Sequence, residues 1–134
     1  MDDWKKKIRK IVEQRQLCSY MNDTKWNELR HAMLEEMPFP PPYVIKWIYK
    51  ECENEDFLED VSYLGDWNEA LAFGDRVHGA AIEWMKIRPR YLKYQGKLVP
   101  PKLIDASAEF EAILNRLHIP YEAEDGAYCI YGYK

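Results

Sequence analysis

The sequence lacks the features that identify a membrane or secreted protein. No apolar run approaches the ~18 residues that a membrane-spanning helix needs. The segment 4–7 (Trp-Lys-Lys-Lys) is followed by further charge rather than by the apolar stretch of a signal peptide. The three cysteines, Cys18, Cys52 and Cys129, are odd in number and far apart, without a Cys-x-x-Cys. We therefore expect a cytoplasmic protein with incidental thiols and without a membrane span.

Signatures of catalysis and of cofactor binding are missing as well. The histidines His31, His78 and His118 lie in distant segments, and none has a His or Cys neighbour at metal-ligand spacing. No serine lies in a Gly-x-Ser-x-Gly elbow, and the six glycines never form Gly-x-Gly-x-x-Gly. We expect no cofactor, no metal and no catalytic residue, which favours a non-enzymatic protein.

Paired carboxylates are the enzymatic alternative that the sequence leaves open. Asp66, Asp75 and Glu83 lie in one stretch together with His78. General acid–base chemistry needs two groups whose environments separate their pKa values. A small enzyme would therefore require these side chains to meet in one pocket. The opposing interpretation places the acids in capped turns and pairs Glu83 with a basic residue.

Apolar and aromatic residues are abundant. A chain of 134 residues is long enough for one domain with a sizeable core, and a hydrophobic fraction of 47% excludes disorder. Aromatic residues make up 14%, which fits either a packed core or an exposed recognition surface. The formal net charge of −4 argues against a general nucleic-acid binder.

The first predicted helix covers residues 3–17, where Trp4, Ile8, Ile11 and Val12 recur at helical spacing opposite a basic face. We interpret residues 1–20 as a basic amphipathic extension that packs on the domain. The alternative is a helix that lies on anionic lipid or in a target groove.

Two further helices are predicted over residues 23–37 and 106–117, each with an apolar stripe. Asn22 or Asp23 can cap the earlier one. Near the end of the chain, Asp125-Gly126 is typical of a two-residue hairpin turn.

Strands are expected where β-branched and aromatic residues gather between turn residues. We predict a single α+β domain over residues 1–134. Its antiparallel sheet of about five strands packs against two N-terminal helices and one C-terminal helix and ends in a β-hairpin. In the hairpin, Ala123 pairs with Tyr128 and Tyr121 with Ile130. The other expected strands are residues 43–50, 61–64, 80–88, a strand that ends near Tyr94, and a short one at 97–99.

Residues 86–102 form the most basic stretch, and no acid occurs between Trp84 and Ile104. Cations can neutralise phosphates and tyrosines can stack on unpaired bases, so single-stranded nucleic acid or RNA is one possible ligand. The stretch can equally face the acidic residues 51–60 of its own chain. Because Trp, Tyr and Arg dominate interface hot spots, the candidate partner-binding residues are Trp67, Arg88, Arg90, Tyr91, Lys93 and Tyr94.

Several blocks of the sequence together resemble a family of small uncharacterised bacterial proteins. The blocks are residues 21–29 (Met-Asn-Asp-Thr-Lys-Trp-Asn-Glu-Leu), 37–43 (Met-Pro-Phe-Pro-Pro-Pro-Tyr), 65–67 (Gly-Asp-Trp), 82–84 (Ile-Glu-Trp), 87–91 (Ile-Arg-Pro-Arg-Tyr) and 118–133 (His-Ile-Pro-Tyr to Ile-Tyr-Gly-Tyr). The resemblance implies a bacterial cytoplasmic protein and supports a strand at 80–88. It supplies no activity, cofactor or catalytic residue.

We therefore expect a non-enzymatic protein-binding module, either an immunity-type inhibitor or a regulatory partner. Acidic proteins of this size can block basic enzymes by electrostatic complementarity. A homodimer is a further interpretation. An edge strand at 43–50 would leave backbone groups unpaired, and a second copy of the chain could pair with them.

Overall fold

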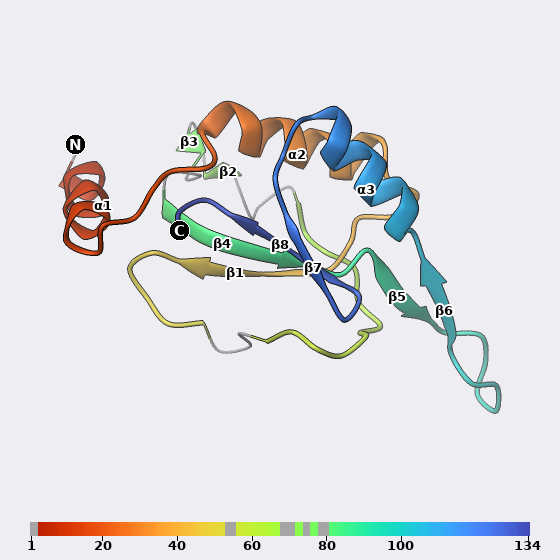
Figure 1. Ribbon diagram of the computed structural model, residues 1–134. Coiled ribbons are helices and arrows are strands. Elements are labelled where there is room, and N and C mark those ends of the chain that lie inside the picture. The colour runs from red at the N-terminus through yellow and green to blue at the C-terminus, as the bar shows by residue number, and fades with distance from the viewer. Residues whose placement is uncertain (1–2, 53–55, 68–71, 74–75, 78–80) are drawn as a thin grey trace.

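The structure is a computed structural model that describes residues 3–52, 56–67, 72–73, 76–77 and 81–134. Helices and antiparallel strands alternate irregularly along the chain, as expected of an α+β protein (Figure 1). The helices are α1 (Asp3–Gln14), α2 (Asp23–Glu35) and α3 (Ser107–Arg116). The strands are β1 (Tyr43–Trp47), β2 (Ala72–Phe73), β3 (Arg76–Val77), β4 (Ile82–Ile87), β5 (Arg90–Lys93), β6 (Lys102–Asp105), β7 (Glu122–Glu124) and β8 (Ala127–Tyr131).

The main sheet has four antiparallel strands in the order β1-β4-β8-β7. Its last two strands form the predicted hairpin, and the predicted pair Ala123–Tyr128 is confirmed. Asp125 and Gly126 both have positive φ, 52° and 81°, which is the geometry that an Asp-Gly type I′ turn needs. The strand expected at 80–88 is confirmed over Ile82–Ile87 as β4, while residue 80 lies outside the described residues. The edge position expected for residues 43–50 is confirmed for β1.

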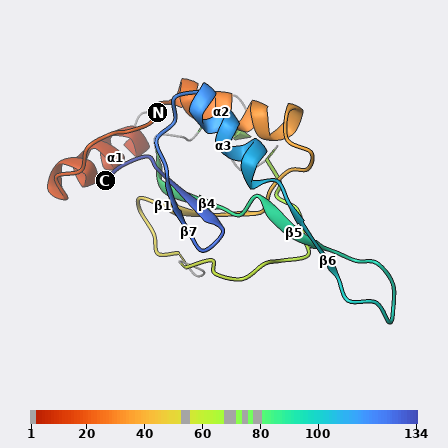
Figure 2. The same cartoon turned by 45° about the vertical axis from the view of Figure 1, so that its right-hand side comes forward.

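Helices α2 and α3 lie side by side over one face of this sheet (Figures 1 and 2). Leu29 and Met33 of α2 and Phe110 of α3 are fully buried against Met85 and Ile130 of the sheet. Asn22 caps α2 by accepting the Lys25 backbone N–H at 2.8 Å, which satisfies a donor that the first helical turn leaves unpaired. One apolar core thus joins the two helices to the β4–β8 centre of the sheet.

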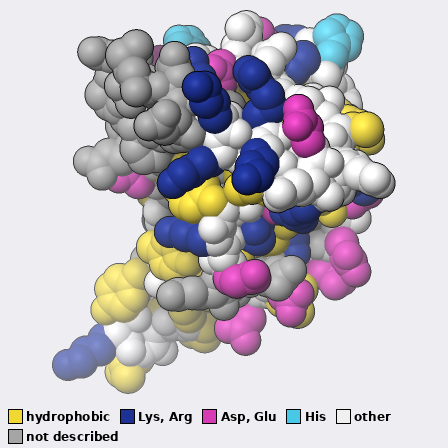
Figure 3. All heavy atoms as spheres, turned by 90° about the vertical axis from the view of Figure 1, so that its left-hand side faces the viewer, with side chains coloured by type: hydrophobic (Ala, Val, Ile, Leu, Met, Phe, Trp, Pro, Cys, Tyr) yellow, Lys and Arg dark blue, Asp and Glu magenta, His cyan; other side chains and the backbone are white. Residues whose placement is uncertain are grey.

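Helix α1 packs at the end of the sheet in a smaller apolar cluster, where Ile8 contacts the buried Ile48 and Ala81. It ends at Gln14 rather than at 17 because Gln16 adopts a left-handed φ of 54°, and Leu17 then donates to the Val12 carbonyl. The apolar face of α1 is therefore used inside the molecule. Its exposed basic side chains are Lys5, Lys6, Lys7, Arg9 and Lys10. Figure 3 looks at the molecule from the side on which α1 lies, and Lys and Arg side chains gather there.

The expectation of one sheet with about five strands is wrong in its arrangement. Two of the expected strands, 61–64 and 97–99, are irregular in the structure. Val61 contributes only a carbonyl, which accepts the Leu92 N–H at 2.8 Å. The strand that pairs with β5 is β6, a few residues beyond 97–99, and the two form a separate two-stranded sheet. Strands β2 and β3 pair with each other as well.

Candidate functional site

The β5–β6 ribbon and its connection project from the body of the molecule (Figures 1 and 2). We call residues 90–105 the arm. Its far end exposes an unusual number of large apolar side chains: Leu98 is 96% exposed, Tyr94 74% and Val99 50%. A two-stranded ribbon is only marginally stable by itself. The arm therefore depends on the contacts at its base.

The base of the arm is fixed by one carboxylate that faces two guanidinium groups. Arg90 donates from Nε to Oδ1 of Asp60 at 2.7 Å and from Nη2 to Oδ2 at 2.9 Å. Arg88 donates to the same Oδ1 from Nη2 at 2.9 Å. Two-point pairing of this kind holds a guanidinium in one orientation, so Asp60 fastens the segment before Val61 to the start of the arm.

Arg88 is the anchor of this cluster, because only 3% of the residue is exposed. Its Nη1 also donates to the carbonyl oxygens of Phe57, at 3.2 Å, and Asp125, at 3.0 Å. Burial by itself would raise the pKa of Asp60, but hydrogen bonds from Arg90 and Arg88 outweigh burial and lower that pKa. The carboxylate is thus ionised at neutral pH and balances a buried cation.

The predicted partner-binding residues differ widely in exposure. Trp67 is 1% exposed, donates from Nε1 to the Pro41 carbonyl at 2.9 Å, and belongs with Arg88 to the interior. Tyr91 is half-buried with its ring edge-on to Phe39 at 4.7 Å between centroids. Lys93 and Tyr94 are exposed on the arm. Arg90, the remaining candidate, pairs with Asp60.

The predicted acid–base residues are described only in part, because Asp75 and His78 lie outside the described residues. Glu83 accepts hydrogen bonds from Arg15 at 2.7 Å and Lys46 at 3.2 Å. The Arg15 hydrogen bond is the main cause that lowers the pKa of Glu83. This matches the interpretation in which Glu83 pairs with basic residues. Asp66, the other described acid of this set, is exposed, and its backbone carbonyl accepts a hydrogen bond from the Tyr43 hydroxyl at 2.5 Å.

The basic stretch 86–102 also divides in two. Its first cations are engaged within the protein, since Arg88 and Arg90 bind Asp60 and the Lys86 Nζ lies 4.9 Å from the Trp84 ring centroid. This is the contact with the acidic segment 51–60 that the sequence left open. The cations farther along, Lys93, Lys97 and Lys102, are exposed on the arm.

Sequence reasoning missed the apolar end of the arm, because Leu98 and Val99 were assigned to a strand. The signal was present in Gly96 and in Pro100-Pro101, which bracket these residues and prevent regular pairing. Sequence reasoning also did not single out Asp60 within the acidic segment. No local pattern distinguishes it from Glu59, whose side chain is exposed.

Among the described residues, no helix is long and apolar enough to cross a membrane. In the same residues, no group of His, Cys, Asp and Glu side chains is arranged to hold a metal ion. One family matches the sequence, over residues 8–134, and its description reads "Family of unknown function (DUF6678)". No curated protein and no solved structure matches the chain.

Proposed function

Because the chain belongs to this family of unknown function, we propose from its own geometry that it is a non-enzymatic protein-binding module whose contact element is the arm. The observation that carries the proposal is the exposure of Leu98, Tyr94 and Val99 at the far end of one projecting element. Exposed apolar patches of monomeric proteins mark interaction sites when polar residues surround them. Here the exposed charged residues of the same segment are lysines: Lys93, Lys97 and Lys102.

The chemistry of the arm defines the partner. No acid occurs between Trp84 and Ile104, and Lys93, Lys97 and Lys102 lie beside the apolar residues. A complementary surface has an apolar groove for Leu98 and Tyr94 and carboxylates at its rim. Such charge complementarity raises association rates and excludes wrong partners. The basic charge of the arm favours an acidic regulatory partner. It argues against a basic enzyme as the target, because two basic surfaces repel each other.

Protein is favoured over nucleic acid as the ligand of residues 86–102. Arg88 and Arg90, which a phosphate-binding surface would use, are both bound to Asp60. The most exposed large apolar side chain of the arm is Leu98, which offers neither charge nor a stacking ring. Three exposed lysines, Lys93, Lys97 and Lys102, remain for phosphate contacts.

The arm exposes apolar side chains without stabilising the rest of the molecule, which supports a role in binding. It shares no ladder with the four-stranded sheet, and its base is held by Asp60 and by the bond from the Ala106 N–H to the Pro89 carbonyl at 2.8 Å. Holding exposed apolar side chains away from the core stabilises nothing in the isolated chain. It does present them to another molecule.

The test starts with a photo-crosslinking residue at position 98, compared with one at position 58 as the control, in cells that make the protein. Leu58 is also exposed, at 57%, but lies outside the arm. The protein crosslinked from 98 is then purified and titrated against wild type and the Tyr94→Ser/Leu98→Ser variant. We expect a 1:1 complex that the variant weakens by more than tenfold, since hot-spot residues contribute about 2 kcal/mol or more each.

The matched control is Tyr49→Ser/Leu58→Ser, which removes a similar exposed pair elsewhere and should leave the affinity unchanged. Equal affinity of wild type and the arm variant would overturn the proposal. Tight binding of a single-stranded oligonucleotide, with steep salt dependence and loss on Lys93→Ala/Lys97→Ala, would replace it with the nucleic-acid alternative.

A further inference from the structure

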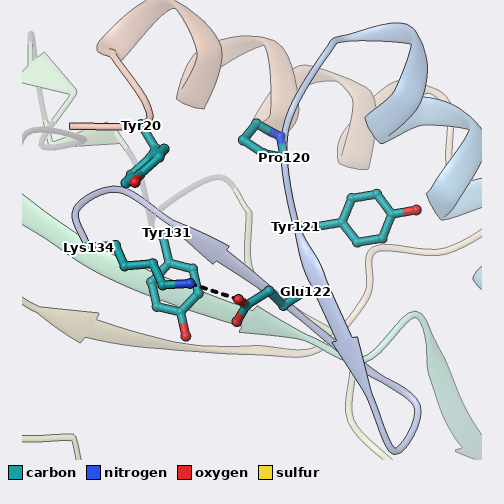
Figure 4. A pocket seen from close by; sticks show the side chains of 6 residues that line it. All are labelled: Tyr20, Pro120, Tyr121, Glu122, Tyr131 and Lys134. Carbon is teal, nitrogen blue, oxygen red and sulfur yellow. Dashed lines mark hydrogen bonds and ion pairs between the residues drawn. The ribbon is translucent and has the colours of Figure 1, made fainter. Parts of the chain in front are cut away.

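A small cavity lies between the segment after α1 and the end of β8, away from the arm (Figure 4). Its volume is 230 Å³, which is below the ~300–1,000 Å³ of typical small-molecule sites and suits a single side-chain group. Tyr20 and Tyr131 flank it, and the Tyr121 ring turns away from them. The lining residues are Tyr20, Pro120, Tyr121, Glu122, Tyr131 and Lys134.

An ammonium group of the chain itself forms part of the wall of this cavity. The Lys134 Nζ lies 2.8 Å from Oε1 of Glu122 and 4.8 Å from the centroid of the Tyr131 ring. A carboxylate and an aromatic face are the two elements by which proteins recognise organic cations. The contacts of Lys134 thus show that Glu122 and the Tyr131 ring together bind an ammonium group.

The backbone holds Lys134 in front of the cavity independently of its side chain. Its N–H donates to the Cys18 carbonyl at 3.0 Å, and its carbonyl accepts the Cys18 N–H at 3.0 Å. The side chain is 53% exposed, and that of Glu122 is 57% exposed. The ammonium can therefore leave for solvent without disturbing the chain that carries it.

The two recognition groups keep the required charge states at neutral pH. The hydrogen bond from Lys134 lowers the pKa of Glu122, which stays ionised. Burial, followed by the influence of Cys129 and Glu122, raises the pKa of Tyr131, so its ring stays neutral and presents an electron-rich face.

We propose that this cavity is a binding site for an alkylammonium group, such as the side chain of a lysine in a peptide or a free alkylamine. In the isolated protein the Lys134 ammonium engages Glu122 and the Tyr131 ring and competes with the ligand for these two groups. Removing the ammonium of Lys134 leaves the Glu122 carboxylate and the faces of Tyr131 and Tyr20 for the incoming cation. The proposal uses no residue of the arm and stands independently of the arm's role.

The test is an NMR titration of wild type and Lys134→Met with n-butylammonium chloride, and with 1-pentanol as the neutral analogue. Methionine matches the lysine side chain up to Cε and keeps the backbone contacts, but it removes the charged ammonium. We expect butylammonium to bind in the millimolar range and roughly three- to tenfold more tightly to Lys134→Met, which is the range for one surface ion pair plus one exposed cation–π contact. Pentanol should not show this gain.

Two further variants make the result specific. Glu122→Gln in the Lys134→Met background should lose at least threefold in affinity. Lys102→Met, which removes an exposed lysine elsewhere, should bind like wild type. Nα-acetyl-lysine amide, titrated in the same way, distinguishes the two sources, because a peptide site binds it more tightly than butylammonium and an amine site does not.

Equal shifts of wild type and Lys134→Met, or equal responses to butylammonium and pentanol, would overturn the proposal. If Lys134→Met lost the native spectrum, wild type alone still decides. In wild type, butylammonium must shift the NMR signals of Glu122 and Tyr131, and pentanol must leave them unchanged. If butylammonium does not shift them, or pentanol does, the site is rejected.

Discussion

Arg90 binds both carboxylate oxygens of Asp60, at 2.7 Å and 2.9 Å, across 30 positions of the sequence. The same carboxylate faces Arg88, whose residue is 3% exposed. The pairing fastens the irregular segment around Phe57 to the start of the arm. It also makes Asp60 a residue whose loss leaves a buried charge without its partner.

Asp60→Asn should lower the free energy of unfolding by about 1–3 kcal/mol. Breaking a fully buried ion pair costs roughly 3–5 kcal/mol, and the 21% exposure of the Asp60 side chain reduces that figure through solvent screening. Urea denaturation at pH 7 measures the change. The exposed neighbour offers the control, since Glu59→Gln should stay within about 0.5 kcal/mol of wild type. Equal effects of both substitutions would contradict the role of Asp60.

The stability contributed by Asp60 should also depend on pH. The pKa of Asp60 is lowered in the folded protein from an unfolded value of 3.8. A lowered pKa contributes stability that is complete above the unfolded pKa and is lost as pH falls through the folded pKa. The difference between wild type and Asp60→Asn should thus be constant between about pH 5 and 7 and shrink below about pH 4. A difference that is unchanged at pH 3 would refute this.

Trp67→Phe should destabilise the fold and leave partner binding intact. The indole donates to the Pro41 carbonyl at 2.9 Å and packs edge-on against Tyr43 at 4.8 Å between centroids. Losing the donor and part of the ring volume should cost about 1–3 kcal/mol, as measured by thermal or urea unfolding. Tyr49→Phe, at a residue that is 60% exposed, serves as the neutral control. An unchanged stability with weakened partner binding would instead place Trp67 in an interface.

Gly132→Ala should destabilise the molecule because there is no space for a methyl group. A Cβ at this position would lie 2.1 Å from the Ile82 carbonyl oxygen and 3.4 Å from the Trp26 ring. The obstacle is backbone within β4, so the strand end must shift, at a cost of about 1–3 kcal/mol. Ala123→Ser, at the exposed edge strand β7, should leave the midpoint of unfolding unchanged. A Gly132→Ala protein as stable as wild type would show that this end of the sheet can adjust.

The arm should open more easily than the main sheet. Its β5–β6 ladder is a separate two-stranded sheet, and its far end buries little apolar surface. Native-state hydrogen exchange should therefore give the ladder amides of Arg90–Lys93 a lower opening free energy than those of β4. Equal protection in both ladders would mean that the arm opens only with global unfolding.

Local signals predicted the fold where the partners lie close in sequence. The Asp125-Gly126 turn sets the register of its own hairpin, and Asn22 caps the helix that follows it. The strands at 61–64 and 97–99 were wrong because β-propensity reports a residue's fit to a half-buried surface. It does not report whether a partner strand exists. Val61 finds only the single N–H of Leu92.

The site was predictable only in part for the same reason. The absence of acid between Trp84 and Ile104 pointed to the arm. Residue type could not tell that Trp67 is a core residue while Tyr94 is exposed, because both types serve in cores and in interfaces. The acid that binds Arg88 is set by where residues 56–61 lie in the folded protein. This placement depends on contacts between distant segments and leaves no local pattern in the sequence.

The position of β8 inside the sheet has a consequence for synthesis on the ribosome. Strand β4 pairs with β1 on one side and with β8 on the other, so its second partner is translated some forty residues after β4 itself. Until residues 127–131 leave the exit tunnel, the apolar surface of the emerging β1–β4 pair lacks the strand that completes it. The nascent chain is therefore expected to become fully compact only once β8 has been released.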